Sequence, residues 1–232
     1  MKKNKTKFIA HRGYSYIETE NTMSSFKKAL ESDFHGVEID IHLTKDKVIV
    51  VHHDDTTTRL SNESYIIKET MCEKLKEVKL IDINTNEYTH KIPTLKEVLD
   101  LVGKYNKISI VEIKPNLSID DLKIVDSLLR SYEKIIVISF HLDNLISLRK
   151  LNKNINLQFL TSKNNPKNFN ICSKYNIDLD LNYKLINDSF LKSIKDKSFI
   201  INAWTVNDIN IVKKLSDLNI DYITSDKISK IE

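Results

Sequence analysis

An alternation of short apolar runs with amphipathic segments is the feature of this chain that most limits its fold. Eight runs rich in β-branched residues have the length of buried strands, at residues 8–11, 37–41, 109–113, 135–139, 157–160, 177–181, 200–204 and 222–224. Between most of them, apolar residues recur three or four positions apart, as in residues 22–32, 95–102, 120–132, 142–151 and 208–218. Eight such βα units in 232 residues predict an α/β fold, a (β/α)8 TIM barrel, because a doubly wound open sheet more often has fewer strands.

The composition is typical of one globular domain, which we expect to span residues 1–232. Hydrophobic residues make up 41% of the chain, and its net charge of +4 comes from 36 basic and 32 acidic residues spread along the whole length. No block of like charge indicates a nucleic-acid partner. No apolar run approaches the length of a membrane span or signal peptide, so we expect a cytoplasmic protein without stable membrane insertion. Cys72 and Cys172 lack metal-ligand spacing and are expected to be inert.

One apolar run, at residues 48–51, interrupts the βα rhythm. It follows the second predicted strand after only residues 44–47, a connection far too short for a parallel crossover. The run therefore predicts an antiparallel hairpin after the second strand. The segment 54–106 is in turn too long for a simple loop and helix, so we expect it to form a small insertion over the barrel mouth.

The length of the hairpin turn decides which acid lies next to His53. If Lys45 and Asp46 form a two-residue turn, Glu38 faces His53. A slip of one position would place His53 opposite Asp40 instead. Both registers predict that His53 lies beside an acid of the second strand.

Three carboxylates are predicted to meet at the barrel mouth. Glu38 and Asp40 are two positions apart on one strand, so their side chains point to the same side, and Glu112 lies at the corresponding end of the next parallel strand. Any one of them taken alone could be a structural ion-pair partner, but three acids together are costly without a cation. Oxygen ligands indicate one divalent cation, Mg²⁺ or Ca²⁺, rather than zinc.

Basic side chains are expected beside these acids. Arg12 ends the first strand at the same mouth, and its planar fork suits a phosphate. Gly13 follows it and allows the backbone to pass close to a ligand or to adopt a positive φ. Lys114, two residues beyond Glu112 on the same face, could supply a second cation for the phosphate or could be a solvated lysine.

Two histidines are candidates for proton transfer. A lone histidine is usually structural, but His11 and His53 both lie at strand ends beside the proposed acid cluster. Because histidine titrates near neutral pH, this pair is suited to act as acid and base.

Several motifs, in this order along nearly the whole chain, resemble the glycerophosphodiester phosphodiesterase family, in particular its bacterial, cytosolic members. They are residues 9–13 (IAHRG), 20–22 (ENT), 37–40 (VEID), 43–46 (LTKD), 50–56 (VVHHDDT), 92–99 (IPTLKEVL), 112–114 (EIK), 139–140 (SF), 203–207 (AWTVN) and 223–226 (ITSD). There are two departures: Thr19 stands where the family usually has proline, and Lys47 replaces the usual glycine of the hairpin turn.

The resemblance implies a role for each candidate residue. It makes His11 and His53 the acid-base pair, Glu38, Asp40 and Glu112 the metal ligands, and Arg12 and Lys114 the phosphate-binding cations. Trp204 would line the substrate pocket, although it could equally be a barrel core residue. Glu20 would have a supporting role.

The expected activity is hydrolysis of a glycerophosphodiester to sn-glycerol 3-phosphate and an alcohol, with a divalent cation and two histidines. The nucleophile is either water or the adjacent hydroxyl of the substrate. One alternative is a lysophospholipase D or sphingomyelinase D-like activity on lipids, and another is a non-catalytic phosphodiester-binding protein. The short segment after residue 224 leaves room for a helix of no more than a turn or two, which leaves a homodimer open.

Overall fold

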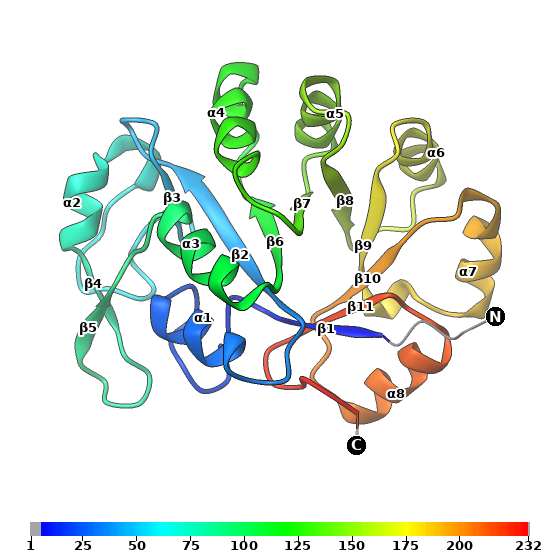
Figure 1. The fold of residues 1–232 in the computed structure, drawn as a ribbon, viewed down its shortest axis with the longest axis horizontal. Coiled ribbons are helices and arrows are strands. Elements are labelled where there is room, and N and C mark those ends of the chain that lie inside the picture. The colour runs from blue at the N-terminus through cyan, green and yellow to red at the C-terminus, as the bar shows by residue number, and fades with distance from the viewer. Residues whose placement is uncertain (1–5, 232) are drawn as a thin grey trace.

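The computed structural model describes residues 6–231, which form a closed barrel of parallel strands (Figure 1). The barrel strands are β1 (Lys7–Ala10), β2 (Gly36–Leu43), β6 (Ile108–Ile113), β7 (Ile135–Ser139), β8 (Asn156–Thr161), β9 (Asp178–Asn182), β10 (Ile201–Trp204) and β11 (Tyr222–Ser225). Each pairs in parallel with the next, and β1 closes the ring by pairing with both β2 and β11. The predicted TIM barrel is confirmed, and each predicted strand lies within two residues of its observed bounds.

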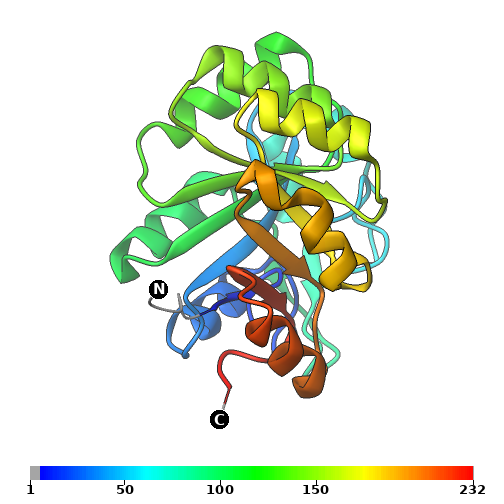
Figure 2. The ribbon, with the colours of Figure 1, turned by 90° about the vertical axis from the view of Figure 1, so that its right-hand side faces the viewer.

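Helices connect the strands and cover the outside of the barrel (Figure 2). They are α1 (Met23–Leu30), α3 (Leu95–Tyr105), α4 (Ile119–Leu129), α5 (Leu142–Leu151), α6 (Pro166–Lys174), α7 (Asp188–Ile194) and α8 (Ile209–Asp217), with the 3-10 turns η2 (Tyr183–Leu185) and η3 (Lys195–Lys197). The part of the chain described after β11 adds no further helix. No helix among residues 6–231 is long and apolar enough to cross a bilayer.

The alternation of side chains along each strand separates an apolar barrel centre from a polar mouth. Ile9, Ile110 and Leu160 belong to an apolar cluster inside the ring, whereas the larger core lies between strands and helices. On β6 the inward position that follows Ile110 is Glu112, which lies at the carboxyl end of the strand. The same two-residue period therefore carries polar side chains to the mouth.

The antiparallel hairpin after β2 is present, but both predicted registers were wrong. β3 (Ile49–Val51) pairs with β2 so that Ile41 faces Val51, and the backbone N–H of His52 donates to Asp40 O at 3.1 Å. The turn holds three residues instead of two, because Lys47 adopts a left-handed conformation with φ of 64°. This conformation also explains why glycine is usual at position 47 in the family that the sequence resembles.

The predicted insertion lies beside β2 and β3, at one side of the barrel (Figure 1). It contains η1 (Ile67–Glu69), α2 (Cys72–Glu77), β4 (Lys79–Ile81) and β5 (Tyr88–Lys91), and its apolar side chains form a small core with Val50 of β3. The Thr19 hydroxyl joins it to the loop before α1, donating to Ile81 O at 2.7 Å and accepting from Ile83 N at 3.1 Å. Thr19 stands where proline is usual, and its hydroxyl makes contacts that proline could not.

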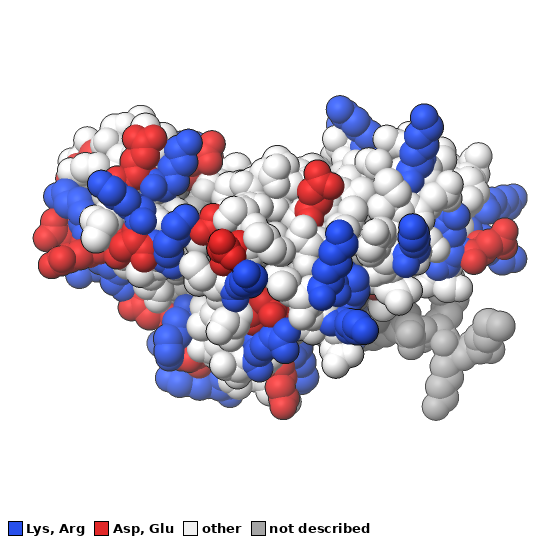
Figure 3. Space-filling view, turned by 90° about the horizontal axis from the view of Figure 1, so that it is seen from above, with Lys and Arg blue, Asp and Glu red and all other residues white. Residues whose placement is uncertain are grey.

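Charged side chains of both signs are interspersed on the end of the molecule that carries this insertion (Figure 3). Within the insertion and at its junction with α3, such charges form ion pairs, as in Lys76 with Glu97, at 2.6 Å, and Lys74 with Glu77, at 3.1 Å. No continuous block of one charge covers this part of the face that Figure 3 shows.

Removing the N-cap of α3 is expected to destabilise the barrel. The Thr94 hydroxyl accepts from the Glu97 backbone N–H at 3.3 Å, and the Glu97 carboxylate accepts from Thr94 N at 2.7 Å. Thr94→Ala should lower the free energy of unfolding by about 1 kcal/mol in urea denaturation. Thr94→Ser keeps the cap and should remain close to wild type; equal losses in both variants would contradict the capping role.

Candidate active site

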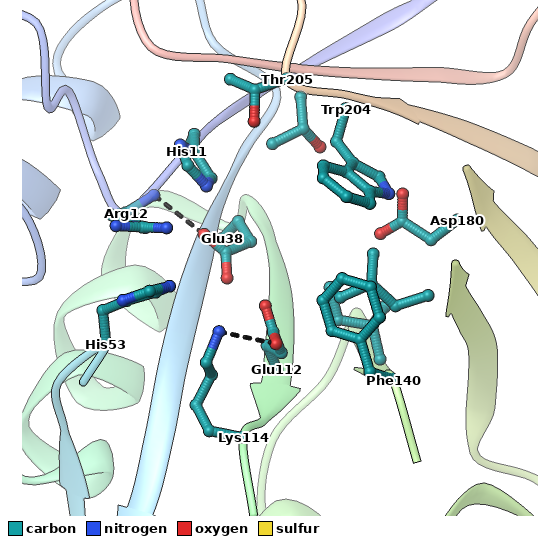
Figure 4. Close-up of a pocket in the computed structure, with 13 residues that line it drawn as sticks. His11, Arg12, Glu38, His53, Glu112, Lys114, Phe140, Asp180, Trp204 and Thr205 are labelled. Atoms are coloured by element: carbon teal, nitrogen blue, oxygen red, sulfur yellow. Dashed lines mark hydrogen bonds and ion pairs between the residues drawn. The ribbon is translucent and has the colours of Figure 1, made fainter. Parts of the chain in front are cut away.

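A cavity of about 150 Å³ opens at the carboxyl ends of the barrel strands (Figure 4). In the view of Figure 4, the two histidines, the two basic side chains and the two glutamates lie on one side of it, and Phe140, Asp180 and Trp204 lie on the other. Its lining residues are His11, Arg12, Glu38, His53, Glu112, Lys114, Ile138, Phe140, Leu160, Asp180, Trp204, Thr205 and Thr224. Of the candidate residues from the sequence, Asp40 alone is not among them, and it lies buried beneath the charged side.

The three candidate acids meet as predicted. One oxygen from each of Glu38, Asp40 and Glu112 lies within 4.8 Å of the others, and all three side chains are buried. Asp40 and Glu112 are register partners on adjacent strands. Two neighbours fix the orientation of the acids: Asn21 Nδ2 donates to Asp40 Oδ2 at 2.8 Å, and Arg12 N donates to Glu38 Oε2 at 3.0 Å.

The acids do not share one protonation state. Burial, and then the charges of Asp40 and Glu112, raise the pKa of Glu38 well above its usual range. Burial and the charge of Asp40 raise the pKa of Glu112 to about 7. Burial would also raise the pKa of Asp40, but the charges of Lys114 and Arg12 outweigh it and lower that pKa to about 2. Full ionisation of the cluster therefore requires more positive charge than the two basic side chains provide.

The donor set fits a divalent cation. Glu38 Oε1 is buried without a hydrogen-bond partner, and Asp40 Oδ1 has only an ion pair with Lys114 Nζ, at 3.4 Å. Lys114 Nζ also lies 2.8 Å from Glu112 Oε1. Buried carboxylate oxygens without donors are the ligands that Mg²⁺ and Ca²⁺ prefer.

Each candidate histidine is oriented by an aspartate. Nδ1 of His11 lies 2.7 Å from Asp226 Oδ1, and Nδ1 of His53 lies 2.7 Å from Asp54 Oδ1. Because the carboxylates accept, Nδ1 carries the proton in both rings, and Nε2 is left for the cavity that both rings line.

The electrostatic environments of the two pairs differ. Burial lowers the pKa of His53, against the opposing charge of Asp40, so this ring is neutral at neutral pH. Burial would raise the pKa of Asp226, but the hydrogen bond from His11 and its charge outweigh it and lower that pKa to about 2. Asp226 therefore stays ionised at neutral pH and accepts a hydrogen bond from Nδ1 of His11.

Arg12 is part of a chain of ion pairs that links the acids to the insertion. Its Nε lies 3.2 Å from Asp40 Oδ2 and its Nη1 lies 3.0 Å from Glu20 Oε1. Arg59 continues the chain, with Nη2 at 2.7 Å from Glu20 Oε1 and Nε at 2.6 Å from Asp54 Oδ2. Glu20 thus pairs with both arginines, and Arg59 brings the aspartate of His53 into the same network.

Gly13 is required by the close approach of the first loop to α1. Its φ is +77°, and a Cβ there would lie 2.4 Å from Ser25 Oγ and 2.6 Å from the Ser25 carbonyl carbon. The preceding Arg12 has φ of 56°. These two left-handed residues turn the chain sharply directly after the Arg12 N–H that donates to Glu38.

Sequence reasoning missed three aspartates of the site. Asp54 and Asp226 orient the histidines, and each lies inside a motif that the sequence analysis had singled out. Asp180 lines the cavity from β9, where the alternation with Leu179 and Leu181 could have marked it as inward-facing. Trp204 lines the cavity as predicted and packs edge-to-face on Phe140 at 5.7 Å.

This fold, with acids, histidines and basic side chains around one cavity at the strand ends, defines a TIM-barrel enzyme. Residues 11–230 match the model of the glycerophosphoryl diester phosphodiesterase family, so the chain belongs to that family and is a phosphodiesterase.

The chain is also similar to individual phosphodiesterases of known sequence or structure. The putative glycerophosphodiester phosphodiesterase YhdW of Bacillus subtilis is 31% identical over 94% of this chain and 93% of its own length. The glycerophosphodiester phosphodiesterase structure from Thermotoga maritima is 29% identical, with a TM-score of 0.80 over 97% of this chain and 96% of that one. An Oleispira antarctica phosphodiesterase, solved with its product sn-glycerol-3-phosphate, has the same fold, with 24% identity and a TM-score of 0.90 over 98% and 95%.

A metal-free form is expected to lose stability as Glu112 ionises. The pKa of Glu112 is raised from 4.5 to about 7, so its protonated form stabilises the fold below pH 4.5, and this contribution disappears as the pH rises through about 7. In EDTA, the unfolding free energy of wild type should fall over this range by on the order of 2 kcal/mol relative to Glu112→Gln.

Excess Mg²⁺ should abolish this difference in pH dependence, because a cation favours the ionised acid. Urea denaturation at each pH measures it, and Glu133→Gln, at an exposed acid, is the control that should follow wild type. Parallel profiles for wild type and Glu112→Gln in EDTA would contradict the electrostatic account of the cluster.

Proposed function

We propose that this chain hydrolyses glycerophosphodiesters to sn-glycerol 3-phosphate and an alcohol, using one divalent cation and a pair of histidines. The observation that carries the proposal is the placement of His11 and His53, each with an aspartate on Nδ1, on the cavity that also contains the buried acids. A protein that only binds phosphodiesters needs basic side chains but has no use for two oriented proton-transfer groups.

Glu38, Asp40 and Glu112 would hold the cation, since their oxygens lie within 4.8 Å of one another and two of them lack hydrogen-bond donors. Bound there, Mg²⁺ or Ca²⁺ would neutralise charge on the phosphate oxygens. Arg12 and Lys114 line the same cavity and add positive charge beside the phosphate. Lys114 now neutralises Glu112 and Asp40, and it is available to a phosphate oxygen when another cation balances these acids.

His53 acts as the base. Its lowered pKa keeps the imidazole neutral, so Nε2 can accept the proton of the attacking hydroxyl, and Asp54 stabilises the charge that develops on the ring. His11 acts as the acid in its protonated form, in which Nδ1–H donates to Asp226 and the Nε2 proton passes to the leaving alkoxide as its bond to phosphorus breaks. Attack by water and attack by the adjacent substrate hydroxyl both use these two proton transfers.

Release of sn-glycerol 3-phosphate from glycerophosphocholine tests the proposal. Wild type should turn over with Mg²⁺ or Ca²⁺, stop in EDTA and recover when the metal is restored. His53→Ala should lose about 10²- to 10⁴-fold in kcat. His90→Ala, in β5 of the insertion and outside the cavity, is the matched control and should keep wild-type activity.

Three outcomes would contradict the proposal. Turnover confined to lysolipids or sphingomyelin would favour the lipid-acting alternative, and a bound diester without turnover would favour a binding protein. Full activity in His53→Ala would remove the proposed base.

A further inference from the structure

The side of the cavity opposite the charged cluster contains two buried polar atoms without partners. Oδ1 of Asp180 and Nε1 of Trp204 are both buried, and neither has a hydrogen bond to any part of the chain that the structure describes. Both residues line the cavity, from the adjacent strands β9 and β10. Figure 4 shows the indole nitrogen turned to the side of the cavity on which Asp180 lies, across from His11 and His53.

Burying an acid at this position without a counter-charge costs free energy. Asp180 is only 1% exposed, and no basic side chain among residues 6–231 forms an ion pair with it. Burial and then the charge of Glu112 raise its pKa well above the usual range, against a hydrogen bond from Asn202. A buried polar atom without a partner costs about 1–3 kcal/mol, so a group that persists in this state inside a cavity is explained by a ligand that pairs with it.

The pair does not extend the metal site. The oxygens that lie within 4.8 Å of one another come from Glu38, Asp40 and Glu112, and Asp180 is not part of this group. Its other neighbours along the cavity wall include Ile138 and Leu160, which offer no ligand atom. An organic group of the substrate is therefore the better partner.

We propose that Asp180 and Trp204 form the subsite that recognises the terminal hydroxyl of the glycerol unit, and that they select glycerophosphodiesters over phosphodiesters that lack this hydroxyl. This inference rests on the proposed function and specifies how the same site chooses its substrate. The indole N–H can only donate, and the oxygen of a hydroxyl accepts from it. The hydrogen of the same hydroxyl is then donated to Asp180 Oδ1, so one substrate group satisfies both atoms.

The headgroup alcohol does not fit this subsite as well. A quaternary ammonium such as that of choline can contact aromatic faces, but it has no lone pair for the indole and would leave the Trp204 N–H buried and unpaired. Phe140 packs edge-to-face on Trp204, with an interplanar angle of 88°, and holds the indole plane in place. The constant glycerol unit thus occupies the buried wall, and the variable alcohol extends toward the open mouth.

The test compares kcat/KM for two substrates, glycerophosphocholine and the choline phosphodiester of propane-1,2-diol, which lacks only the terminal hydroxyl. The adjacent hydroxyl remains in both, so either route of attack is preserved. Wild type should prefer the glycerol compound by about tenfold to a hundredfold. In Asp180→Leu and Trp204→Phe, the ratio of the two kcat/KM values should be close to one, because kcat/KM should fall for glycerophosphocholine only.

Two further variants separate recognition from a structural role. Asp180→Asn keeps an acceptor oxygen and should retain most of the preference. Gln158→Leu is the matched control: Gln158 is also buried with an unpaired oxygen, on the adjacent strand β8, but it does not line the cavity, so the ratio should stay at the wild-type value.

Folding and metal binding provide independent readouts. Leucine removes a buried acid that has no ion pair but also removes the hydrogen bond with Asn202, so the Tm of Asp180→Leu should stay close to that of wild type. Its half-activating Mg²⁺ concentration should be unchanged, because Asp180 is not a ligand.

Four results would overturn the inference. They are an unchanged ratio in Asp180→Leu, equal losses on both substrates, a changed ratio in Gln158→Leu alone, and equal turnover of both substrates by wild type. The last of these leaves the proposed function intact, whereas turnover of neither substrate by wild type overturns both proposals.

Discussion

Repulsion among three buried carboxylates is the constraint on which the mouth of this barrel depends. One carboxylate oxygen from each of Glu38, Asp40 and Glu112 lies within 4.8 Å of the others, because the adjacent parallel strands β2 and β6 bring these residues together. Ionised together, they require positive charge, and Lys114 and Arg12 supply part of it. The raised pKa values of Glu38 and Glu112 show that these two basic side chains are not sufficient. A divalent cation would complete the neutralisation and draw a phosphodiester to the same place.

The same network extends beyond the acids to the proton-transfer groups. Arg12 contacts Asp40 and Glu20, and Arg59 joins Glu20 to the aspartate that orients His53. No residue of the insertion that carries Arg59 lines the cavity, yet through this chain of ion pairs the insertion holds the aspartate that orients His53. A segment beside the barrel thereby contributes to the geometry at its centre.

The periodicity of the sequence was sufficient to predict the barrel, because strand and helix periods report which side chains are buried. It also predicted that the side chains of Glu38 and Asp40 point to the same side of β2, because residues two positions apart on a strand always do so. The hairpin register depended on the backbone conformation of Lys47, which residue type alone does not determine. The pairing of His11 with Asp226 joins the two ends of the chain, and that contact exists only once β11 closes against β1. The absence of a hydrogen-bond partner for Asp180 Oδ1 likewise depends on which side chains of the neighbouring strands surround it.

Diffraction from crystals soaked in Mn²⁺, measured at the manganese absorption edge, tests the central claim most directly. We expect one anomalous peak, bounded by carboxylate oxygens of Glu38, Asp40 and Glu112, with Lys114 displaced from the acids toward the cavity. No peak at this position, with Lys114 still bound between Glu112 and Asp40, would show that the lysine is the permanent counter-charge of the cluster and would contradict the account.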